Sequence, residues 1–262
     1  MESRPSSVAG MFYPRDPDHL EQLLEKFYRN KRSDLDAKGI VAPHAGYIYS
    51  GEVAATAFAA IPDTFSGTFV VIGPSHRGYL TCTSAVPWET PLGMMDVDRG
   101  FLQALDIRVD EASHRNEHSI EVQLPFIKHR FPRAAIAPIM MGEQSLVSAQ
   151  AVAARILAAI RATSRDVRIV ASSDFSHYVP QEIARKQDLF AIEALRSLDV
   201  PEFYRRIEAE RVTACGYGPI SGMVLVAKEQ GAKTGDLLQY QTSGDVTGDF
   251  DQVVGYGAIA VV

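Results

Sequence analysis

The sequence is poor in cysteine, with only Cys82 and Cys215 among its 262 residues, far apart and in unlike surroundings. Small secreted domains depend on several disulfides, so two isolated cysteines favour a protein kept in a reducing compartment. Residues 1–5 also lack the apolar core of a signal peptide. We therefore expect the protein to be cytoplasmic.

Long apolar runs and clusters of one charge are scarce as well. No stretch approaches the roughly 18 uninterrupted apolar residues of a membrane span. The net charge is -6, and lysine and arginine form no cluster, which argues against a nucleic-acid footprint. Glycine-rich phosphate loops of the Walker and Rossmann types and the Gly-x-Ser-x-Gly elbow of hydrolases are missing too. We expect neither a membrane nor a nucleic acid as a partner.

One pattern occurs three times: a short apolar strand that is followed at once by histidine. The three segments cover residues 39–44, 69–76 and 167–177 and end in His44, His76 and His177. Open α/β sheets bind their ligands beyond the carboxyl ends of the strands. A single histidine in such a place needs no cofactor, because it can simply hydrogen-bond a loop. For three histidines in the same kind of place, that interpretation would require a coincidence. The pattern therefore predicts one shared site, and we expect this site to bind a metal.

The order of the predicted elements indicates an α/β fold with a mainly parallel central sheet and helices on both faces. Strand, helix and strand alternate from residue 39 to residue 73, as in a βαβ unit. No linker divides the chain, so we predict one domain over residues 1–262. Residues 87–93 are predicted as a loop, and Pro125 disfavours a helix capped by Ser119 beyond its first turn. Helices are predicted over residues 17–29, 52–60, 97–105, 145–163, 180–197, 201–210 and 218–231, and further strands over 134–140 and 253–262.

Cys215 is followed by two glycines and a proline directly before a predicted helix. A thiol at a helix N-terminus has a lowered pKa, which suits a metal ligand or a nucleophile. A small buried residue in a tight turn explains the same pattern equally well. A rival use of these residues is a hydrolase with Cys215 as nucleophile and His177 or His76 as base. Cys82, in a segment rich in threonine and serine, is expected to be structural.

Acidic residues lie close to several of these histidines in the sequence. Asp174 precedes His177 by three residues, so it is predicted either to bind the metal or to orient the imidazole. Glu117, His118 and Glu121 form a compact cluster in which His118 and Glu121 are spaced to share a helical face. This cluster suits a supporting or substrate-facing role, and a solvated helix start explains it equally well.

At these motifs the sequence resembles the Memo family, whose prokaryotic members are called AmmeMemoRadiSam system protein B. The similarity runs from about residue 5 to the C-terminus. It rests on five motifs in the right order, which read VAPHAGY (41–47), GPSH (73–76), EHSIEVQLPF (117–126), SSDFSHY (172–178) and CGYGPI (215–220). The family is similar in fold to class III extradiol dioxygenases, which use a non-haem ferrous iron, so the resemblance implies that fold here.

The resemblance also implies roles for individual residues. His44, His76 and Cys215 match the metal ligands of the family. His177, with Asp174 beside it, matches the acid/base histidine of the dioxygenases. The residues expected to contact substrate or to support the ligands are His118, Glu121 and Tyr47.

A thiolate here stands where the dioxygenases have a carboxylate, which speaks against ring cleavage. Because a thiolate is softer and more electron-donating, it favours iron or copper redox chemistry and also accepts zinc. We expect Fe(II) first, copper second and zinc third. We therefore expect an oxidoreductase that is dioxygenase-like and acts on an unknown substrate. In this enzyme His177 would shuttle a proton.

A second hypothesis comes from another class of protein. The ancestral pocket would then bind a peptide or a protein without catalysis. The family's name implies a link to a radical S-adenosylmethionine enzyme and an AMMECR-type protein as partners. If the variant His44→Ala loses partner binding as well as its metal, the two functions depend on the same site.

Overall fold

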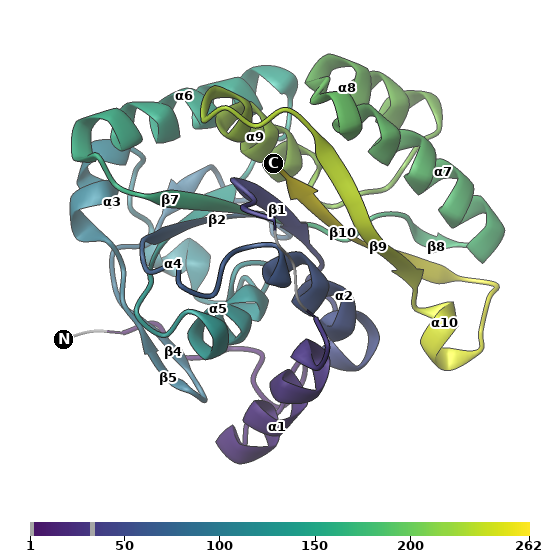
Figure 1. Ribbon diagram of the computed structural model, residues 1–262, viewed down its shortest axis with the longest axis horizontal. Helices are drawn as coiled ribbons and strands as arrows, with labels where there is room; N and C mark the ends of the chain where they lie inside the picture. Colours follow the sequence, from purple (N-terminus) through teal and green to yellow (C-terminus); the bar gives the residue numbers. More distant parts are fainter. Residues whose placement is uncertain (1–2, 32–34) are drawn as a thin grey trace.

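A mixed β-sheet of eight strands lies at the centre of the computed structural model, which describes residues 3–31 and 35–262 (Figure 1). Its strands are β1 (Gly39–Ala42), β2 (Thr68–Pro74), β3 (Cys82–Thr83), β6 (Ala135–Met141), β7 (Val167–Ser172), β8 (His177–Val179), β9 (Gly235–Thr242) and β10 (Val253–Val261). They are arranged in the order β3-β6-β2-β7-β1-β10-β8, with β9 on β10. The central strands β6, β2, β7 and β1 are parallel, and the outer strands pair antiparallel. This arrangement confirms the predicted α/β class.

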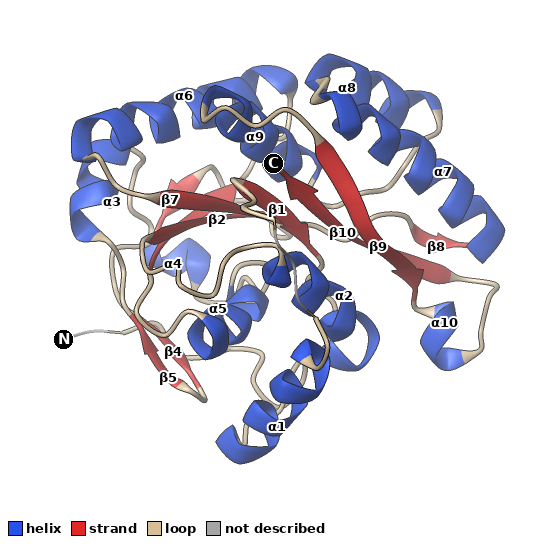
Figure 2. Ribbon diagram, in the orientation of Figure 1, coloured by secondary structure: helices blue, strands red, loops and turns tan. Residues whose placement is uncertain are grey.

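Helices cover both faces of this sheet. They are α1 (Pro17–Tyr28), α2 (Tyr47–Ala59), α3 (Arg99–Leu105), α4 (Glu111–His114), α5 (Leu124–Arg130), α6 (Leu146–Thr163), α7 (Gln181–Glu193), α8 (Val200–Ala209), α9 (Tyr217–Glu229) and α10 (Gly244–Thr247), with 3-10 turns η1 (Glu121–Gln123) and η2 (Ala194–Ser197). On one face α9 contacts β7, β1 and β2, and α6 packs on α9. On the other face α2 contacts β1 and β10, and α1 and α5 pack on α2. Figure 2 shows the strands between these layers.

The strands that lead to the histidines are buried along their whole length. Because helices cover both faces of a central parallel sheet, such strands are continuous apolar runs rather than alternating ones. This explains why β1, β2 and β7 were recognisable from sequence.

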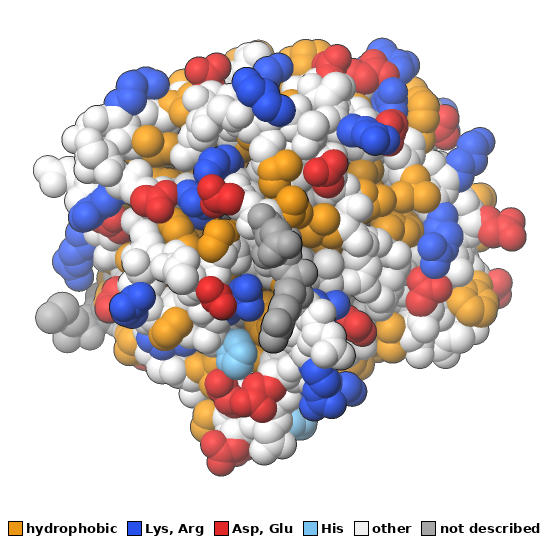
Figure 3. Space-filling model, viewed as in Figure 1, with side chains coloured by type: hydrophobic (Ala, Val, Ile, Leu, Met, Phe, Trp, Pro, Cys, Tyr) orange, Lys and Arg blue, Asp and Glu red, His pale blue; other side chains and the backbone are white. Residues whose placement is uncertain are grey.

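On the face drawn in Figure 3, acidic and basic side chains are interspersed.

Among the described residues, one helix, α6, is long and apolar enough to cross a membrane when judged by length and composition alone. One helix of this kind is weak evidence for a membrane span. In the structure α6 packs on α9 and α3, as a helix of a globular domain does.

Several local predictions were wrong. α2 begins at Tyr47 instead of residue 52, and the backbone N–H of Tyr47 donates to the Phe12 carbonyl. Residues 87–93 are not simply a loop, because β4 (Trp88–Thr90) and β5 (Gly93–Met95) form a hairpin there. Ser119 caps no helix, and Pro125 lies in the first turn of α5, where its missing N–H is not needed.

Candidate metal centre

The topology brings the ends of three strands to one edge of the sheet. β2, β7 and β1 are neighbours and parallel. His76 follows the end of β2 by two residues, Asp174 follows β7 by two, and His44 follows β1 by two. Parallel strands end at the same edge, and the predicted convergence there is observed for His44 and His76. His177, the third histidine of the prediction, does not belong to the histidine cluster, and His118 takes its place.

Three imidazoles form a cluster at this edge. His44, His76 and His118 each place one ligand atom within 4.8 Å of the others. Their ring centroids are 5.2 Å apart for His44 and His76, 5.4 Å for His44 and His118, and 4.6 Å for His76 and His118. The His44 side chain is only 3% exposed, whereas 33% of His76 and 24% of His118 is accessible. The cluster therefore opens to solvent on the side of His76 and His118.

His44 is held with its Nε2 lone pair directed into the cluster. The Ser172 hydroxyl donates its only proton to the Ser119 carbonyl at 2.6 Å and accepts from Gln123 Nε2 at 2.9 Å. The 2.8 Å contact between His44 Nδ1 and the Ser172 oxygen is therefore a bond donated by Nδ1–H. This leaves Nε2 unprotonated, which is the form of histidine that binds a metal.

Glu117 fixes His76 in the same way. Its carboxylate accepts from His76 Nδ1 at 2.9 Å, from the His76 backbone N–H at 2.8 Å and from the Ser119 N–H at 2.9 Å. Burial alone would raise the pKa of Glu117, but the hydrogen bonds and charge of His76, with the Ser119 N–H, hold it below its usual range. The carboxylate thus stays ionised, and because it engages Nδ1, Nε2 is the ring nitrogen of His76 that remains for other contacts. Gly73 permits this approach, since a Cβ there would lie 2.4 Å from Ser119 Oγ.

Cys215 lies directly beside His44. Its Sγ is 3.2 Å from His44 Nε2 and accepts the Asp174 backbone N–H at 3.2 Å. The Asp174 carboxylate in turn accepts the His44 backbone N–H at 2.9 Å, and its other oxygen lies 4.0 Å from His44 Nε2. The predicted neighbours Asp174, Cys215 and His44 are therefore in direct contact.

The surroundings of Cys215 raise the pKa of its thiol. The sequence left two interpretations of this residue equally open, a thiol with a lowered pKa and a small buried residue. Desolvation raises the pKa of the Cys215 thiol, and the negative charge of Asp174 raises it further. Burial lowers the pKa of His44 well below its usual value, and His118 and His76 lower it further. Both shifts favour a neutral thiol and a neutral imidazole in the metal-free protein over the thiolate and imidazolium of a cysteine hydrolase.

We expect iodoacetamide to alkylate Cys215 slowly in the metal-free protein near neutral pH, because the thiolate is scarce. Mass spectrometry after timed quenching gives the rate, and Cys82→Ser isolates the modification at Cys215. Glutathione under the same conditions supplies the rate of an ordinary thiol. Alkylation of Cys215 that is faster than alkylation of glutathione would instead support the hydrolase hypothesis.

His177 lies at the margin of the cluster. It begins β8, its backbone N–H donates to Thr213 Oγ1 at 2.7 Å, and its Nδ1 lies 3.0 Å from the Thr213 carbonyl. Burial raises the pKa of Asp174. The backbone N–H of His44 and the imidazole of His177 counteract that rise, so His177 lies within electrostatic reach of Asp174. The next residue, Tyr178, has φ 58 and is 72% exposed. A bulky residue held in the left-handed region outside a helix end is strained.

Two residues predicted to face substrate or to support the ligands lie in the interior. The Tyr47 hydroxyl donates to the Val122 carbonyl at 2.8 Å, and its ring packs on Tyr13 and Phe126. Glu121 is fully buried and bonded to Arg4 at 2.7 Å. Both stabilise the segment that carries His118.

Sequence reasoning did not single out Ser172 and Gln123, which fix the orientation of His44. Ser172 begins the polar run SSD (172–174), and Gln123 is a single polar residue between a valine and a leucine, so neither stands out in the sequence. The sequence also predicted no specific partner for Glu117, because the contact of Glu117 with His76 joins segments 41 residues apart.

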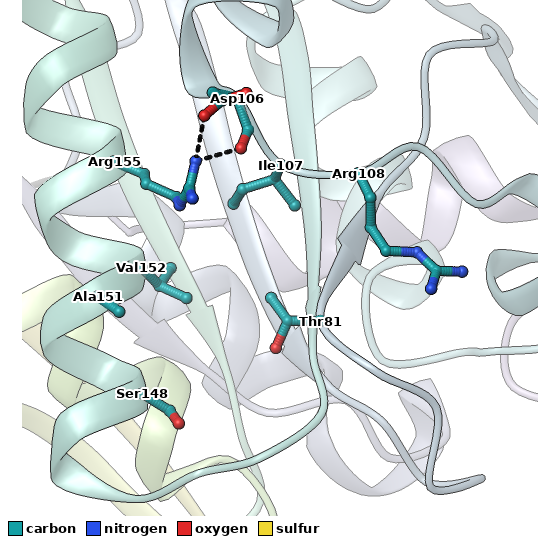
Figure 4. Close-up of a pocket in the computed structure, with 8 residues that line it drawn as sticks. All are labelled: Thr81, Asp106, Ile107, Arg108, Ser148, Ala151, Val152 and Arg155. Atoms are coloured by element: carbon teal, nitrogen blue, oxygen red, sulfur yellow. Dashed lines mark hydrogen bonds and ion pairs between the residues drawn. The ribbon is translucent and has the colours of Figure 1, made fainter.

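A separate cavity of about 250 Å³ lies between α6 and the segment that follows α3. Figure 4 shows Arg155 reaching from α6 to Asp106 at this cavity, with an ion pair of 2.7 Å. The lining contains no residue of the histidine cluster.

The donors at the carboxyl edge fit a transition metal. Imidazole nitrogens suit iron, copper and zinc, and a thiolate adds preference for the softer ions. The Nδ1 atoms of His44 and His76 are engaged by the protein, which is how metal-binding histidines are oriented. The fold and site thus define an α/β protein with a cluster of metal-type donors at the carboxyl edge of its sheet.

Comparison with known proteins gives the family. Residues 4–260 match the family described as Memo-like protein. A MEMO1 family protein of Methanosarcina barkeri is 43% identical over 265 residues, covering 98% of this chain and 99% of its own. Another, from Methanococcoides burtonii, is 45% identical with the same coverage, and one from Archaeoglobus fulgidus is 42% identical over 96% of this chain and 97% of its own. The chain belongs to the Memo-like family, as its motifs predicted.

Proposed function

We propose that the protein binds one transition-metal ion at the carboxyl edge of its sheet through His44, His76 and Cys215. The observation that carries the proposal is the cluster of the His44, His76 and His118 imidazoles, whose ligand atoms lie within 4.8 Å of one another, with the Cys215 thiol 3.2 Å from His44 Nε2. His118 lies beside the proposed ligands. Fe(II) is the first candidate, followed by copper and then zinc. Metal binding would displace the thiol proton, because the thiolate is the ligand form.

The bound ion would supply redox chemistry, dioxygenase-like in kind, toward a small molecule. Within the chain, His44 and His76 would orient the ion. Asp174, with its raised pKa, can hold a proton beside Cys215 and His44. His177 would exchange that proton with solvent, since its ring lies at the margin of the cluster.

Elemental analysis of anaerobically purified protein tests the proposal. We expect about one iron or copper per chain in the wild type and its loss in both His76→Ala and Cys215→Ser. His129→Ala and Cys82→Ser are matched controls, because neither residue belongs to the cluster, and both should retain the metal. Folded proteins that all lack metal would contradict the proposal.

A second candidate function, peptide or protein binding, is favoured by the surface around the cluster. Among the described residues, five large apolar side chains are at least 70% exposed: Met11, Ile48, Leu80, Val147 and Tyr178. Four follow the carboxyl ends of strands, and Met11 adjoins Phe12, whose ring contacts His118. A radical S-adenosylmethionine enzyme and an AMMECR-type protein are the proposed partners. Loss of binding in Leu80→Ser with the metal retained would favour this function.

A further inference from the structure

Residues 4–13, here called the N-terminal strap, lie across the segment that carries Glu117 and His118. Arg4 makes the first connection, and its side chain is only 3% exposed. Its guanidinium donates to the carbonyls of His114 and Glu117, both at 2.8 Å, and to Glu121 Oε2 at 2.7 Å. The same group lies 4.0 Å from the centre of the Trp88 ring. One buried side chain thus binds three points of residues 114–121.

Glu121 makes the reverse connection, from that segment to the strap. Its carboxylate accepts the backbone N–H groups of Ser7 and Val8 at 2.9 Å and the Tyr13 hydroxyl at 2.8 Å. Burial alone would raise the pKa of Glu121, but the charge of Arg4 and these N–H donors lower it. Hydrogen bonds to an ionised acceptor are about twice as strong as neutral ones. The strap is therefore fixed along most of its length.

The strap reaches the histidine cluster by two routes. Arg4 holds the backbone carbonyl of Glu117, and the side chain of Glu117 holds both the N–H and the Nδ1 of His76. Phe12 contacts His118 directly, with ring centroids 4.8 Å apart. Both routes are continuous chains of contacts.

We propose that the N-terminal strap is part of the metal centre, with Arg4 and Phe12 as positioning residues for His76 and His118. This inference rests on the proposed metal site. A strap that orders the ligands must itself be ordered by the metal, because coupling between two sites is reciprocal. Metal binding would therefore lower the equilibrium constant for opening of the strap by the factor by which the closed strap raises metal affinity.

Zn(II) is a suitable probe, since it binds without redox chemistry. We expect Arg4→Met to weaken Zn(II) binding about tenfold or more in competition with a chromogenic chelator, the loss typical of groups that orient ligands. Arg4→Lys should recover part of the affinity. Arg168→Met is the matched control, because Arg168 is also buried and lies over an aromatic ring, Phe65, but at the start of β7. The Co(II) absorption spectrum should change in Arg4→Met and not in Arg168→Met.

A second variant and a second measurement keep the test decisive if Arg4→Met folds poorly. Phe12→Ala leaves the bonds of Arg4 in place and should still weaken Zn(II) binding several-fold, because Phe12 packs on His118, which lies beside the proposed ligands in the histidine cluster. In the wild type, Zn(II) should slow hydrogen exchange at the Ser7 and Val8 amides. Zn(II) binding that is unchanged in both variants, with unchanged exchange, would overturn the role of the strap alone. A wild type that binds no metal ion would overturn the strap and the proposed function together.

Discussion

Replacing Glu117 by alanine is expected to lower the affinity for Zn(II) about 100-fold, and replacing it by glutamine about tenfold. The carboxylate accepts three hydrogen bonds, two of them from His76, so alanine frees the ring and leaves two N–H groups without their acceptor. Glutamine keeps one oxygen as acceptor for the His76 ring but removes the charge. Competition titrations with a chromogenic chelator measure both values.

Asp98→Asn is the control for this comparison, because the Asp98 carboxylate is also buried and accepts hydrogen bonds from Thr68 Oγ1 and the Phe101 N–H, but it lies beside the start of β2 and has no contact with the cluster in the described structure. Its Zn(II) affinity should equal that of the wild type. Equal affinities for the wild type and Glu117→Ala, at unchanged stability, would show that Glu117 has no part in metal binding.

The second large effect is a loss of folding stability at acidic pH. The pKa of His114 is lowered to about 4, chiefly by burial and next by the charge of Arg4. An unfolded imidazole titrates near pH 6.5, so between pH 6.5 and pH 4 the unfolded chain binds a proton that the folded chain does not. Folding stability therefore falls as the pH falls, and His114 alone contributes a loss of about 3 kcal/mol by pH 4. Burial also lowers the pKa values of His44 and His118, which adds loss of the same sign.

Urea unfolding of the metal-free protein at pH 7 and pH 4 measures this loss. His114→Phe should lose about 3 kcal/mol less than the wild type between the two pH values. His19→Phe, at an exposed histidine, serves as the control and should behave like the wild type. The account of His114 fails if the wild type and His114→Phe lose the same stability.

The strands and the edge at which His44 and His76 meet were predictable, because their signals are local. A buried parallel strand is a continuous apolar run, and a glycine or proline after it marks its end. The strand β9 was missed, since its sequence, GDLLQYQT, contains glycine, aspartate and two glutamines and does not alternate regularly. Its pairing with β10 stabilises it, and that pairing cannot be inferred from β9 alone.

The neighbours of each ligand were harder to predict because they depend on approach in three dimensions. His118 belongs to no strand, and its position follows from Ser119 packing against Gly73. For Cys215 the sequence left an acidic thiol and a small buried residue equally open, and in the fold desolvation and the charge of Asp174 raise the thiol pKa. Tyr47 shares a motif with His44, yet its side chain points into the aromatic interior. Proximity in sequence did not translate into a shared role.

The long separations in sequence within the cluster set the order of events during synthesis. Cys215 follows His44 by 171 positions, and β10, which pairs with β1, comes later still. At ribosomal rates of about 5–20 residues per second, His44 emerges roughly 10–30 s before the cysteine beside it exists. A nascent chain therefore carries histidines without a finished binding site. Under the proposed function, metal would therefore be acquired at a late stage of biogenesis, after β10 has paired with β1.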